Sequence, residues 1–397
     1  MHIAFDITAL AEPKTGIGQY RFNLLKEFIN HPPSFHRRRT GKLRIVNHEF
    51  TAYGFNFRSY KNLKAVEKLF KNTKNLNFSL YKIPRRPLIM SWILWRWPSL
   101  DFFVKNVDVF HVSDNMQSPT RKPTVATIHD LSAVMFPQYH SKKNAFVDKC
   151  RFQQISKYAD QIICVSENTK NDFLNKYKFD PDRIHVIYNG VDHEKLFPIK
   201  DFEKIQKFKE KYHLFHPFIL FLGTIEPRKN VFQLVKAFYE LKKQEKIVQK
   251  LVICGKKGWF YDEIFKFIKE KKIEQDIIFL GYVDENDKNA LINASDFIVY
   301  PSFYEGFGLP VVEAMSCGKS VITSKVSSLP EVAGDAALYL DPFSINDIAD
   351  KIFTLTKDLD LRKKLEEKSL LQSKKFSWQK CAEETMKVYE KAALHLL

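Results

Sequence analysis

Residues 297–313 of the chain read Phe-Ile-Val-Tyr-Pro-Ser-Phe-Tyr-Glu-Gly-Phe-Gly-Leu-Pro-Val-Val-Glu. The opening apolar run predicts a short buried strand that ends at Tyr300. Gly306 and Gly308 permit close approach of the backbone to a ligand, and Pro310 suits the first turn of a following helix. Strand, loop and helix in this order form the repeating unit of a parallel α/β sheet.

The same alternation recurs in two series along the chain. The first series of predicted strands covers residues 3–7, 108–112, 124–128, 161–165 and 183–187. The second covers residues 218–222, 251–254, 277–280, 297–300 and 320–323, with helices predicted over 230–244, 261–271 and 287–295. Strands that alternate with helices form parallel sheets. We therefore predict two α/β domains, at residues 1–195 and 196–375, and a last helix within residues 376–397.

Length and composition agree with a globular protein of two domains. The chain has 397 residues, of which 45% are apolar and 27% charged, and this balance excludes intrinsic disorder. The five cysteines are scattered without a Cys-x-x-Cys pair, which favours reduced thiols over a zinc site or a disulfide framework. The formal net charge of +17 indicates a polyanionic partner: nucleic acid, an anionic membrane or a phosphorylated small molecule.

Most of this charge lies in residues 31–106, called here the basic aromatic segment. It holds 16 Lys and Arg against 3 Asp and Glu, a net +13, together with 14 aromatic residues. Basic side chains beside clustered tryptophans suit an anionic bilayer, because charge attracts headgroups while indole rings settle at the interface. A basic loop beside a buried core helix explains the pattern equally well. The candidate membrane residues are Arg85, Arg86, Trp92, Trp95 and Trp97.

Neither the N-terminus nor any apolar cluster indicates insertion into a membrane. Residues 1–6 form an apolar run that reads as a strand, because a signal peptide needs a longer apolar stretch after a basic start. The longest apolar cluster, residues 88–95, is too short to span a bilayer. Nucleic acid ranks below the membrane as a partner, because no recognised nucleic-acid-binding motif is present.

A candidate diphosphate site follows the strand predicted over 218–222. Residues 223–230 read Gly-Thr-Ile-Glu-Pro-Arg-Lys-Asn. The glycine allows a tight turn, and Arg228 and Lys229 stand at the predicted start of a helix, where amides and the helix dipole favour an anion. Two cations at that place could neutralise a pyrophosphate. An exposed Arg-Lys pair is common on protein surfaces, but its place after a strand favours phosphate binding.

Two carboxylates flank the glycine loop quoted first. Glu305 lies in the loop and Glu313 is predicted in the first helical turn, so both could face one ligand. Carboxylates accept hydrogen bonds from sugar hydroxyls, whereas the amides of residues 307–309 would point at a phosphate. The alternative is that Glu313 simply stabilises a helix N-terminus as a nearby acid.

These motifs resemble the signatures of retaining glycosyltransferases of family 4. The resemblance rests on Glu305 and Glu313 with Gly-Phe-Gly-Leu-Pro between them, and on Gly-Thr-x-x-x-Arg-Lys-Asn over 223–230. Residues 327–332 and 376–378 are similar to stretches that the family has at these places. The loop Thr-Gly-Ile-Gly-Gln-Tyr over 15–20 resembles that of the family's mannosyltransferases, of the type in bacterial lipopolysaccharide and polysaccharide biosynthesis.

The resemblance implies the GT-B architecture, in which two Rossmann-like domains with parallel sheets face a central cleft. The N-terminal domain would bind the acceptor and the C-terminal domain the nucleotide-sugar, and the last helix would cross back to the N-terminal domain. Such enzymes need no cofactor and generally no divalent metal for the donor. The two Asp-x-Asp stretches, at 180–182 and 358–360, do not follow core strands, so we expect no metal site.

The resemblance also assigns roles to single residues of the second half. Arg228 and Lys229 would bind the donor diphosphate, and Glu313 the ribose of the nucleotide. Glu305 would sit over the transferred sugar. The expected donor-binding residues are Arg228, Lys229, Gly223, Thr224, Glu313, Phe307, Gly308, Leu309, Tyr282, Val283, Gly16 and Gly18, with Tyr282 and Val283 at the base and the two N-terminal glycines at the phosphate. For Tyr282 an ordinary loop aromatic is the alternative.

In the first half, His129 follows the strand predicted over 124–128. A lone histidine is more often structural, but its place after a strand, followed by Asp130, favours a role near the transferred sugar, where the family often has a histidine. Glu305, His129 and Lys229 are thus the expected catalytic residues. Ser166 follows another strand and reads as a helix N-cap.

The expected activity is transfer of a hexosyl group, most readily mannosyl, with retained configuration, to a saccharide or lipid-linked hydroxyl. GDP-mannose is the favoured donor and a UDP-hexose the second choice. We expect a cytoplasmic protein, peripheral on the inner face of the membrane. Two alternatives stay open: a GT-B epimerase or hydrolase acting on nucleotide-sugars, and a non-catalytic membrane-binding relative.

Overall fold

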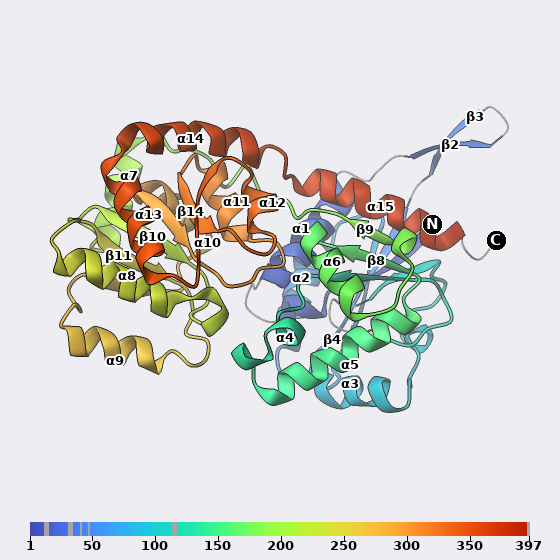
Figure 1. Cartoon of the computed structure of the whole chain (residues 1–397). Coiled ribbons are helices and arrows are strands. Elements are labelled where there is room, and N and C mark those ends of the chain that lie inside the picture. The colour runs from blue at the N-terminus through green and yellow to red at the C-terminus, as the bar shows by residue number, and fades with distance from the viewer. Residues whose placement is uncertain (12–15, 31–34, 40–41, 47, 113–116, 395–397) are drawn as a thin grey trace. The chain divides into compact units, whose positions relative to one another are not determined.

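The computed structural model describes residues 1–11, 16–30, 35–39, 42–46, 48–112 and 117–394 (Figure 1). Thr15 of the predicted N-terminal loop and several residues of the basic aromatic segment therefore lie outside the described residues. The chain forms two compact units. The N-terminal unit comprises Met1–Gly190 with Trp378–Leu397, and the C-terminal unit comprises Val191–Ser377.

A seven-stranded parallel sheet is the centre of the N-terminal unit. Its strands lie in the order β5-β4-β1-β6-β7-β8-β9. The order reverses its direction between β1 and β6, so right-handed crossovers place helices on both faces of the sheet. The strands are β1 (His2–Asp6), β4 (Glu49–Phe55), β5 (Leu76–Tyr81), β6 (Val109–His111), β7 (Thr124–Ile128), β8 (Gln161–Cys164) and β9 (Ile184–Val186).

Seven α-helices of the described residues belong to this unit, together with a two-stranded antiparallel ribbon. The ribbon pairs β2 (Phe35–Arg39) with β3 (Lys42–Val46). Ser166 caps the helix that follows β8, as predicted, because its side chain accepts the backbone N–H of Thr169. The helices are α1 (Gly16–Asn30), α2 (Tyr60–Leu69), α3 (Arg85–Leu94), α4 (Ser132–Met135), α5 (Lys142–Tyr158), α6 (Glu167–Lys176) and α15 (Trp378–Leu394).

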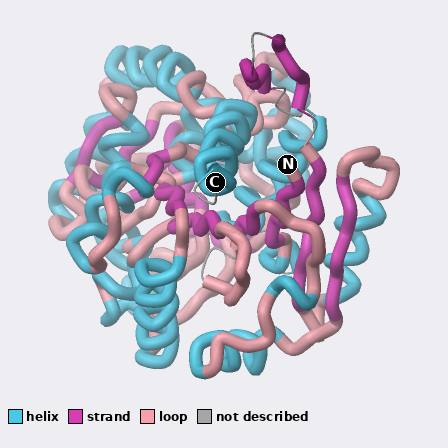
Figure 2. The backbone as a smooth tube through the Cα atoms, turned by 90° about the vertical axis from the view of Figure 1, so that its right-hand side faces the viewer, coloured by secondary structure: helices cyan, strands magenta, loops and turns pink. Residues whose placement is uncertain are grey.

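The C-terminal unit has a six-stranded parallel sheet in the order β12-β11-β10-β13-β14-β15. Figure 2, which draws strands in magenta and helices in cyan, shows neighbouring strands running side by side among helices. The strands are β10 (Phe218–Leu222), β11 (Lys250–Cys254), β12 (Ile277–Gly281), β13 (Phe297–Tyr300), β14 (Val321–Ser324) and β15 (Ala337–Leu340). The helices are α7 (Phe202–Lys211), α8 (Val231–Lys243), α9 (Asp262–Lys271), α10 (Glu285–Ala294), α11 (Leu309–Ser316), α12 (Leu329–Ala333), α13 (Ile345–Lys357) and α14 (Leu359–Ser373).

Each strand predicted from the sequence has a counterpart that differs by at most two residues at either end. The strands β4, β5 and β15 were not predicted. In β5 the residues after Leu76 are only half-buried or exposed, and they mix polar and apolar side chains, so no continuous apolar run marks the strand. Pairing with β4 at the sheet edge, rather than a local apolar pattern, makes this segment a strand.

The last helix of the chain packs against the N-terminal unit, beside α1 (Figure 1). On α15, Tyr389 is fully buried, and its hydroxyl lies 2.5 Å from Nδ1 of His111 at the end of β6. The other ring nitrogen of His111 lies 2.8 Å from the hydroxyl of Thr127 on β7. These buried hydrogen bonds thus link α15 to two central strands and satisfy the buried side-chain groups of Tyr389, His111 and Thr127.

We predict that Tyr389→Ala destabilises the N-terminal unit by about 3–5 kcal/mol, because it empties a buried aromatic site and removes the hydrogen-bond partner of His111. Denaturant unfolding would measure this loss. Lys387→Ala, at an exposed position of the same helix, should change stability by less than about 0.5 kcal/mol. Equal losses in the two variants would show that α15 does not stabilise the unit through its buried face.

Candidate active site

The two motifs of the second half follow adjacent strands at the centre of the six-stranded sheet. β10 pairs with β13, and the strand order runs outward from this pair in both directions. Such a reversal leaves an opening beyond the carboxyl ends of the two strands, where ligands bind in open α/β sheets. The loop with Arg228 and Lys229 begins after β10, and the glycine loop with Glu305 begins after β13.

Arg228 and Lys229 lie in a 3₁₀ turn, Pro227–Lys229, and not in the helix itself, which begins at Val231. The helix predicted from residue 230 begins at Val231, so the two cations lie in the turn directly before it. Between turn and helix, Asn230 adopts a left-handed conformation with φ of 59°. Its side-chain amide donates to the carbonyl oxygens of Pro301 at 3.0 Å and Pro342 at 2.7 Å, which fixes the turn against the loop after β13.

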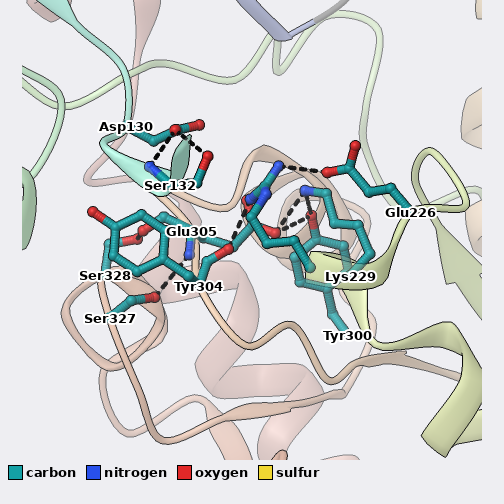
Figure 3. A network of polar contacts seen from close by, with 10 residues as sticks. Asp130, Ser132, Glu226, Lys229, Tyr300, Tyr304, Glu305, Ser327 and Ser328 are labelled. Carbon is teal, nitrogen blue, oxygen red and sulfur yellow. Dashed lines mark hydrogen bonds and ion pairs between the residues drawn. The ribbon is translucent and has the colours of Figure 1, made fainter. Parts of the chain in front are cut away.

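The structure brings Arg228, Lys229 and Glu305 into one buried ionic network (Figure 3). The guanidinium of Arg228 donates to Glu305 Oε2 at 2.9 Å and to Glu226 Oε1 at 2.8 Å. The ammonium of Lys229 donates to Glu305 Oε1 at 2.6 Å and to the Tyr300 hydroxyl at 2.6 Å. That hydroxyl in turn donates to Glu305 Oε1 at 3.0 Å. Both oxygens of Glu305 are thus engaged by the protein.

The network changes the titration of its members. Burial alone would raise the pKa of Glu305, but Arg228 and Lys229 lower it to about 2, so this carboxylate is ionised at neutral pH. Burial and the adjacent Arg228 lower the pKa of Lys229. Burial and the Glu305 charge raise the pKa of Tyr300 well above its usual value, so its hydroxyl stays a donor. Two cations therefore face two carboxylates, and one ammonium N–H of Lys229 is available to an anion.

The backbone of Glu305, like its side chain, forms hydrogen bonds with neighbouring residues. The backbone N–H of Glu305 donates to the Ser327 hydroxyl at 2.9 Å, and its carbonyl accepts the hydroxyl of Ser328 at 2.9 Å. Gly308 has φ of 98°, and a Cβ there would lie 2.8 Å from a methyl of Leu329. Glycine is therefore required at this position.

Glu313 is the fifth residue of α11, one turn further along the helix than predicted. It is buried and bonded to Lys288 of α10, with 2.5 Å between the ammonium and Oε1. Burial raises the pKa of Glu313, and Lys288 opposes this rise. The reading of Glu313 as a simple helix N-terminal acid is wrong, because α11 has no acid in its first turn.

Of the remaining predicted residues of this unit, Leu309 begins α11, and the others lie in loops at the same edge of the sheet. Tyr282 and Val283 directly follow β12. The Tyr282 side chain is half exposed, with the ammonium of Lys256 at 5.3 Å from the ring centre, whereas Val283 is buried. Phe307 is buried against Phe376. In the loop after β10, Gly223 lies so close to Gly255 that a Cβ on the latter would meet the Gly223 carbonyl at 1.9 Å.

In the N-terminal unit, Gly16 and Gly18 lie in the first turn of α1. His129 directly follows β7, and its ring packs edge-on against Tyr20 of α1 at 4.7 Å between centres. Asp130 accepts hydrogen bonds from the backbone N–H of Ser132 at 2.9 Å and from its hydroxyl at 2.6 Å (Figure 3). This acid therefore orders the start of the short helix α4.

The comparisons with known proteins agree with this geometry. A family model described as Glycosyl transferases group 1 matches residues 202–371, and one described as Glycosyltransferase Family 4 matches residues 44–195. The O-antigen chain mannosyltransferase B of Escherichia coli is 30% identical over 397 residues, which cover 98% of this chain and 100% of that protein. The chain belongs to glycosyltransferase family 4.

Two solved structures support the same architecture for this family-4 chain. The structure of Alr3699/HepE from Anabaena in complex with UDP and glucose has a TM-score of 0.71 at 16% identity, and covers 98% of this chain and 100% of that chain. The structure of WaaG, a glycosyltransferase involved in lipopolysaccharide biosynthesis, has a TM-score of 0.70 at 15% identity, and covers 96% and 98%. The predicted GT-B fold is confirmed, and the chain is a glycosyltransferase. The epimerase, hydrolase and non-catalytic alternatives are not favoured.

The predicted membrane residues of this glycosyltransferase divide between two faces of α3 and the loop after it. Trp92 is buried, and its indole N–H donates to the Pro98 carbonyl at 2.8 Å, so it cannot contact a bilayer and that prediction was wrong. Trp95 and Trp97 are 73% and 65% exposed. Arg86 is exposed and Arg85 half-buried in the first turn of α3. In the described part of the chain, no helix is long and apolar enough to cross a membrane.

Three residues that contact the predicted site residues were missed in the sequence. Glu226 lies two residues before Arg228, Tyr300 ends the strand β13, and Lys288 lies in the first turn of α10. For Tyr300 a signal existed, because a polar group at the last residue of a central strand lies at the ligand edge. Lys288 had none, because only the packing of α10 on α11 brings it to Glu313. Among the residues described, no group of three His, Cys, Asp or Glu could hold a metal ion.

We predict that the stabilising effect of Glu305 disappears in acid. Its pKa in the folded state is about 2 against an ordinary 4.5, so its contribution is complete above 4.5 and is lost as the pH falls toward 2. The difference in unfolding free energy between wild type and Glu305→Gln should shrink by up to about 3 kcal/mol over this range.

Denaturant titrations at several pH values would measure that difference. Glu203→Gln, at a carboxylate that is 84% exposed, controls for the loss of one negative charge from the same unit. A difference between wild type and Glu305→Gln that stays constant from pH 6 to the acid limit would contradict the role of the two cations.

Proposed function

We propose that this glycosyltransferase moves a hexosyl group, most readily mannosyl, from a nucleotide diphosphate sugar to a hydroxyl of a saccharide or lipid-linked acceptor, with retention of configuration. The observation that carries the proposal is the pair Arg228 and Lys229, whose side chains are only 11% and 12% exposed, at the carboxyl ends of β10 and β13. The name of the Escherichia coli relative supports mannosyl transfer in polysaccharide assembly.

The two cations would stabilise the leaving group. As the bond from the anomeric carbon to the phosphate oxygen breaks, negative charge builds on the diphosphate. Arg228 and Lys229 are already fixed by Glu305, so they can stabilise that charge without reorganising. The acceptor oxygen would bond to the anomeric carbon on the same face, and its proton would pass to a diphosphate oxygen.

The other predicted residues would hold the donor. Glu313 would accept a hydrogen bond from the ribose, Tyr282 and Val283 would contact the base, and the amides of residues 307–309 would line the phosphate and the sugar. For the donor, GDP-mannose remains the favoured choice, and the relative's name supports its mannosyl group. A UDP-hexose is supported by the UDP and glucose bound to the Anabaena protein. In the N-terminal unit, His129 and the glycines at 16 and 18 would face the transferred sugar and its phosphate.

A panel of nucleotide-sugars tests the activity, with turnover measured in the presence and absence of a lipid-linked saccharide acceptor. Transfer that needs the acceptor supports the proposal, whereas equal turnover without it would indicate hydrolysis or epimerisation. Anomeric analysis of the product by nuclear magnetic resonance would decide between retention and inversion.

With the preferred donor, Lys229→Ala should lower transfer at least about a hundredfold, because a preorganised donor to the leaving group is lost. Lys325→Ala is the matched control: this lysine is 61% exposed and forms an ion pair with Asp341 in the same unit. Near-normal turnover in a folded Lys229→Ala protein would contradict the diphosphate assignment.

We also propose that the exposed side of α3 and its following loop docks on an anionic membrane. Leu94, Trp95, Trp97 and Phe102, at the end of α3 and in the segment after it, are each at least 60% exposed. Arg85 and Arg86 lie in the first turn of the same helix. Apolar side chains that enter the interface and cations that attract headgroups act together in such binding. This docking would bring a cytoplasmic enzyme to a lipid-linked acceptor.

Replacing Trp95 and Trp97 by serine should weaken binding to vesicles that contain phosphatidylglycerol at least about tenfold, because two exposed indoles no longer enter the bilayer. Vesicle sedimentation would measure this. Phe202 and Phe215, which are 77% and 65% exposed in the C-terminal unit, provide the control double variant. Binding that ignores anionic lipid content or salt concentration would contradict the docking.

A further inference from the structure

The carboxylates of Glu305 and Glu313 differ in how the protein uses their oxygens. Both oxygens of Glu305 accept hydrogen bonds from neighbouring side chains. Glu313 Oε1 accepts from Lys288, but within the described ranges Oε2 has no hydrogen-bond partner. A carboxylate offers about four acceptor positions. Glu313 therefore keeps acceptor capacity for a ligand, in a place where water competes little because the residue is buried.

The position of Lys288 allows its ammonium to fix the orientation of the Glu313 carboxylate. It lies in the first turn of α10, five residues after Val283 of the predicted base-binding loop. The next residue, Asn289, accepts a hydrogen bond from the thiol of Cys317, which lies one turn beyond Glu313 on α11. Two contacts, one turn apart, thus fix the register of α10 on α11 and aim the ammonium of Lys288 at one oxygen of Glu313.

The geometry points to Lys288 as a positioning residue that holds Glu313 Oε1, so that Oε2 is presented to the ribose hydroxyls of the donor nucleotide. This inference rests on the proposed function and names a determinant of ribose recognition. The ammonium makes a buried carboxylate tolerable and sets its rotation. Without it, burial would favour the protonated acid, which accepts fewer hydrogen bonds.

Charges on the adjoining elements keep Lys288 protonated, whereas burial and the Glu285 charge raise the pKa of Glu313 and Lys288 opposes that rise. Burial lowers the pKa of Lys288, but Glu313 on α11 and Glu285 on α10 raise it above its usual value, and Cys254 at the end of β11 adds to the rise. Lys288 therefore stays a cation over the range in which the enzyme would work. The cation and the direction of its N–H bond are both needed for the proposed role.

The test compares nucleotides that have or lack ribose hydroxyls. Binding of GDP and UDP, and of their 2′,3′-dideoxy counterparts, is measured by calorimetry for wild type and Lys288→Met. The wild type should prefer the ribonucleotide. Lys288→Met should weaken ribonucleotide binding at least about tenfold while leaving the dideoxy compound almost unchanged. In turnover, KM for the donor should rise more than kcat falls.

Two further variants separate positioning from general stability. Lys288→Arg keeps a cationic donor and should restore part of the ribose preference. Lys211→Met removes an exposed ion pair that the same helix makes through Asp287, at 2.6 Å, and should leave the preference intact. Lys288→Gln serves where the methionine variant does not fold.

The nucleotide-binding results separate the positioning role of Lys288 from the ribose assignment of Glu313 and from the transferase activity. An unchanged ribose preference in Lys288→Met, or an equal weakening of both nucleotide types, would overturn the positioning role. If the wild type binds a nucleotide with no ribose preference, the assignment of Glu313 fails while the transferase proposal stands. If the wild type binds none of the nucleotides and turns over no nucleotide-sugar, the proposed function fails and this inference fails with it.

Discussion

The shared carboxylate of Glu305, held between Arg228 and Lys229, is the interaction on which the site of this glycosyltransferase depends. Two cations side by side in a buried place would repel each other and lose hydration. Glu305 and Glu226 compensate both costs, and Tyr300 completes the coordination of the ammonium. The cations are thereby fixed at the ends of two central strands before any ligand arrives. Preorganisation of this kind is what stabilisation of a leaving diphosphate requires.

Two glutamates eight positions apart obtain different properties from their surroundings. Glu305 faces two cations, which lower its pKa to about 2, and both its oxygens are bonded. Glu313 faces one cation, its pKa is raised by burial, and one oxygen remains open among the residues described. The first therefore organises positive charge, and the second is suited to accept from a ligand hydroxyl.

The helix α3 shows how one apolar run can serve two purposes. Leu88, Ile89 and Trp92 enter the core of the N-terminal unit, whereas Leu94 and Trp95 remain exposed. The sequence offered a buried helix and a membrane surface as alternatives of equal weight. The structure assigns different side chains of the same helix and loop to the core and to the surface, because helical periodicity separates them.

The sequence by itself determined the fold class of this protein and the main motifs of its candidate site. Apolar runs that alternate with amphipathic stretches are local patterns, and they predicted ten strands of the two parallel sheets within two residues. Motif spacing likewise singled out Arg228, Lys229, Glu305 and Glu313. The structure then showed the ion pairs that these residues form.

Only the tertiary structure decided which partners these residues have. Tyr300 and Glu226 are near in sequence to the network. The Tyr300 hydroxyl meets Lys229 because β13 pairs with β10, and the Glu226 carboxylate meets Arg228 because of the turn between them. Lys288 meets Glu313 across 25 residues because α10 packs on α11. Such contacts depend on how elements pack and not on the identity of neighbouring residues, so no local pattern in the sequence can encode them.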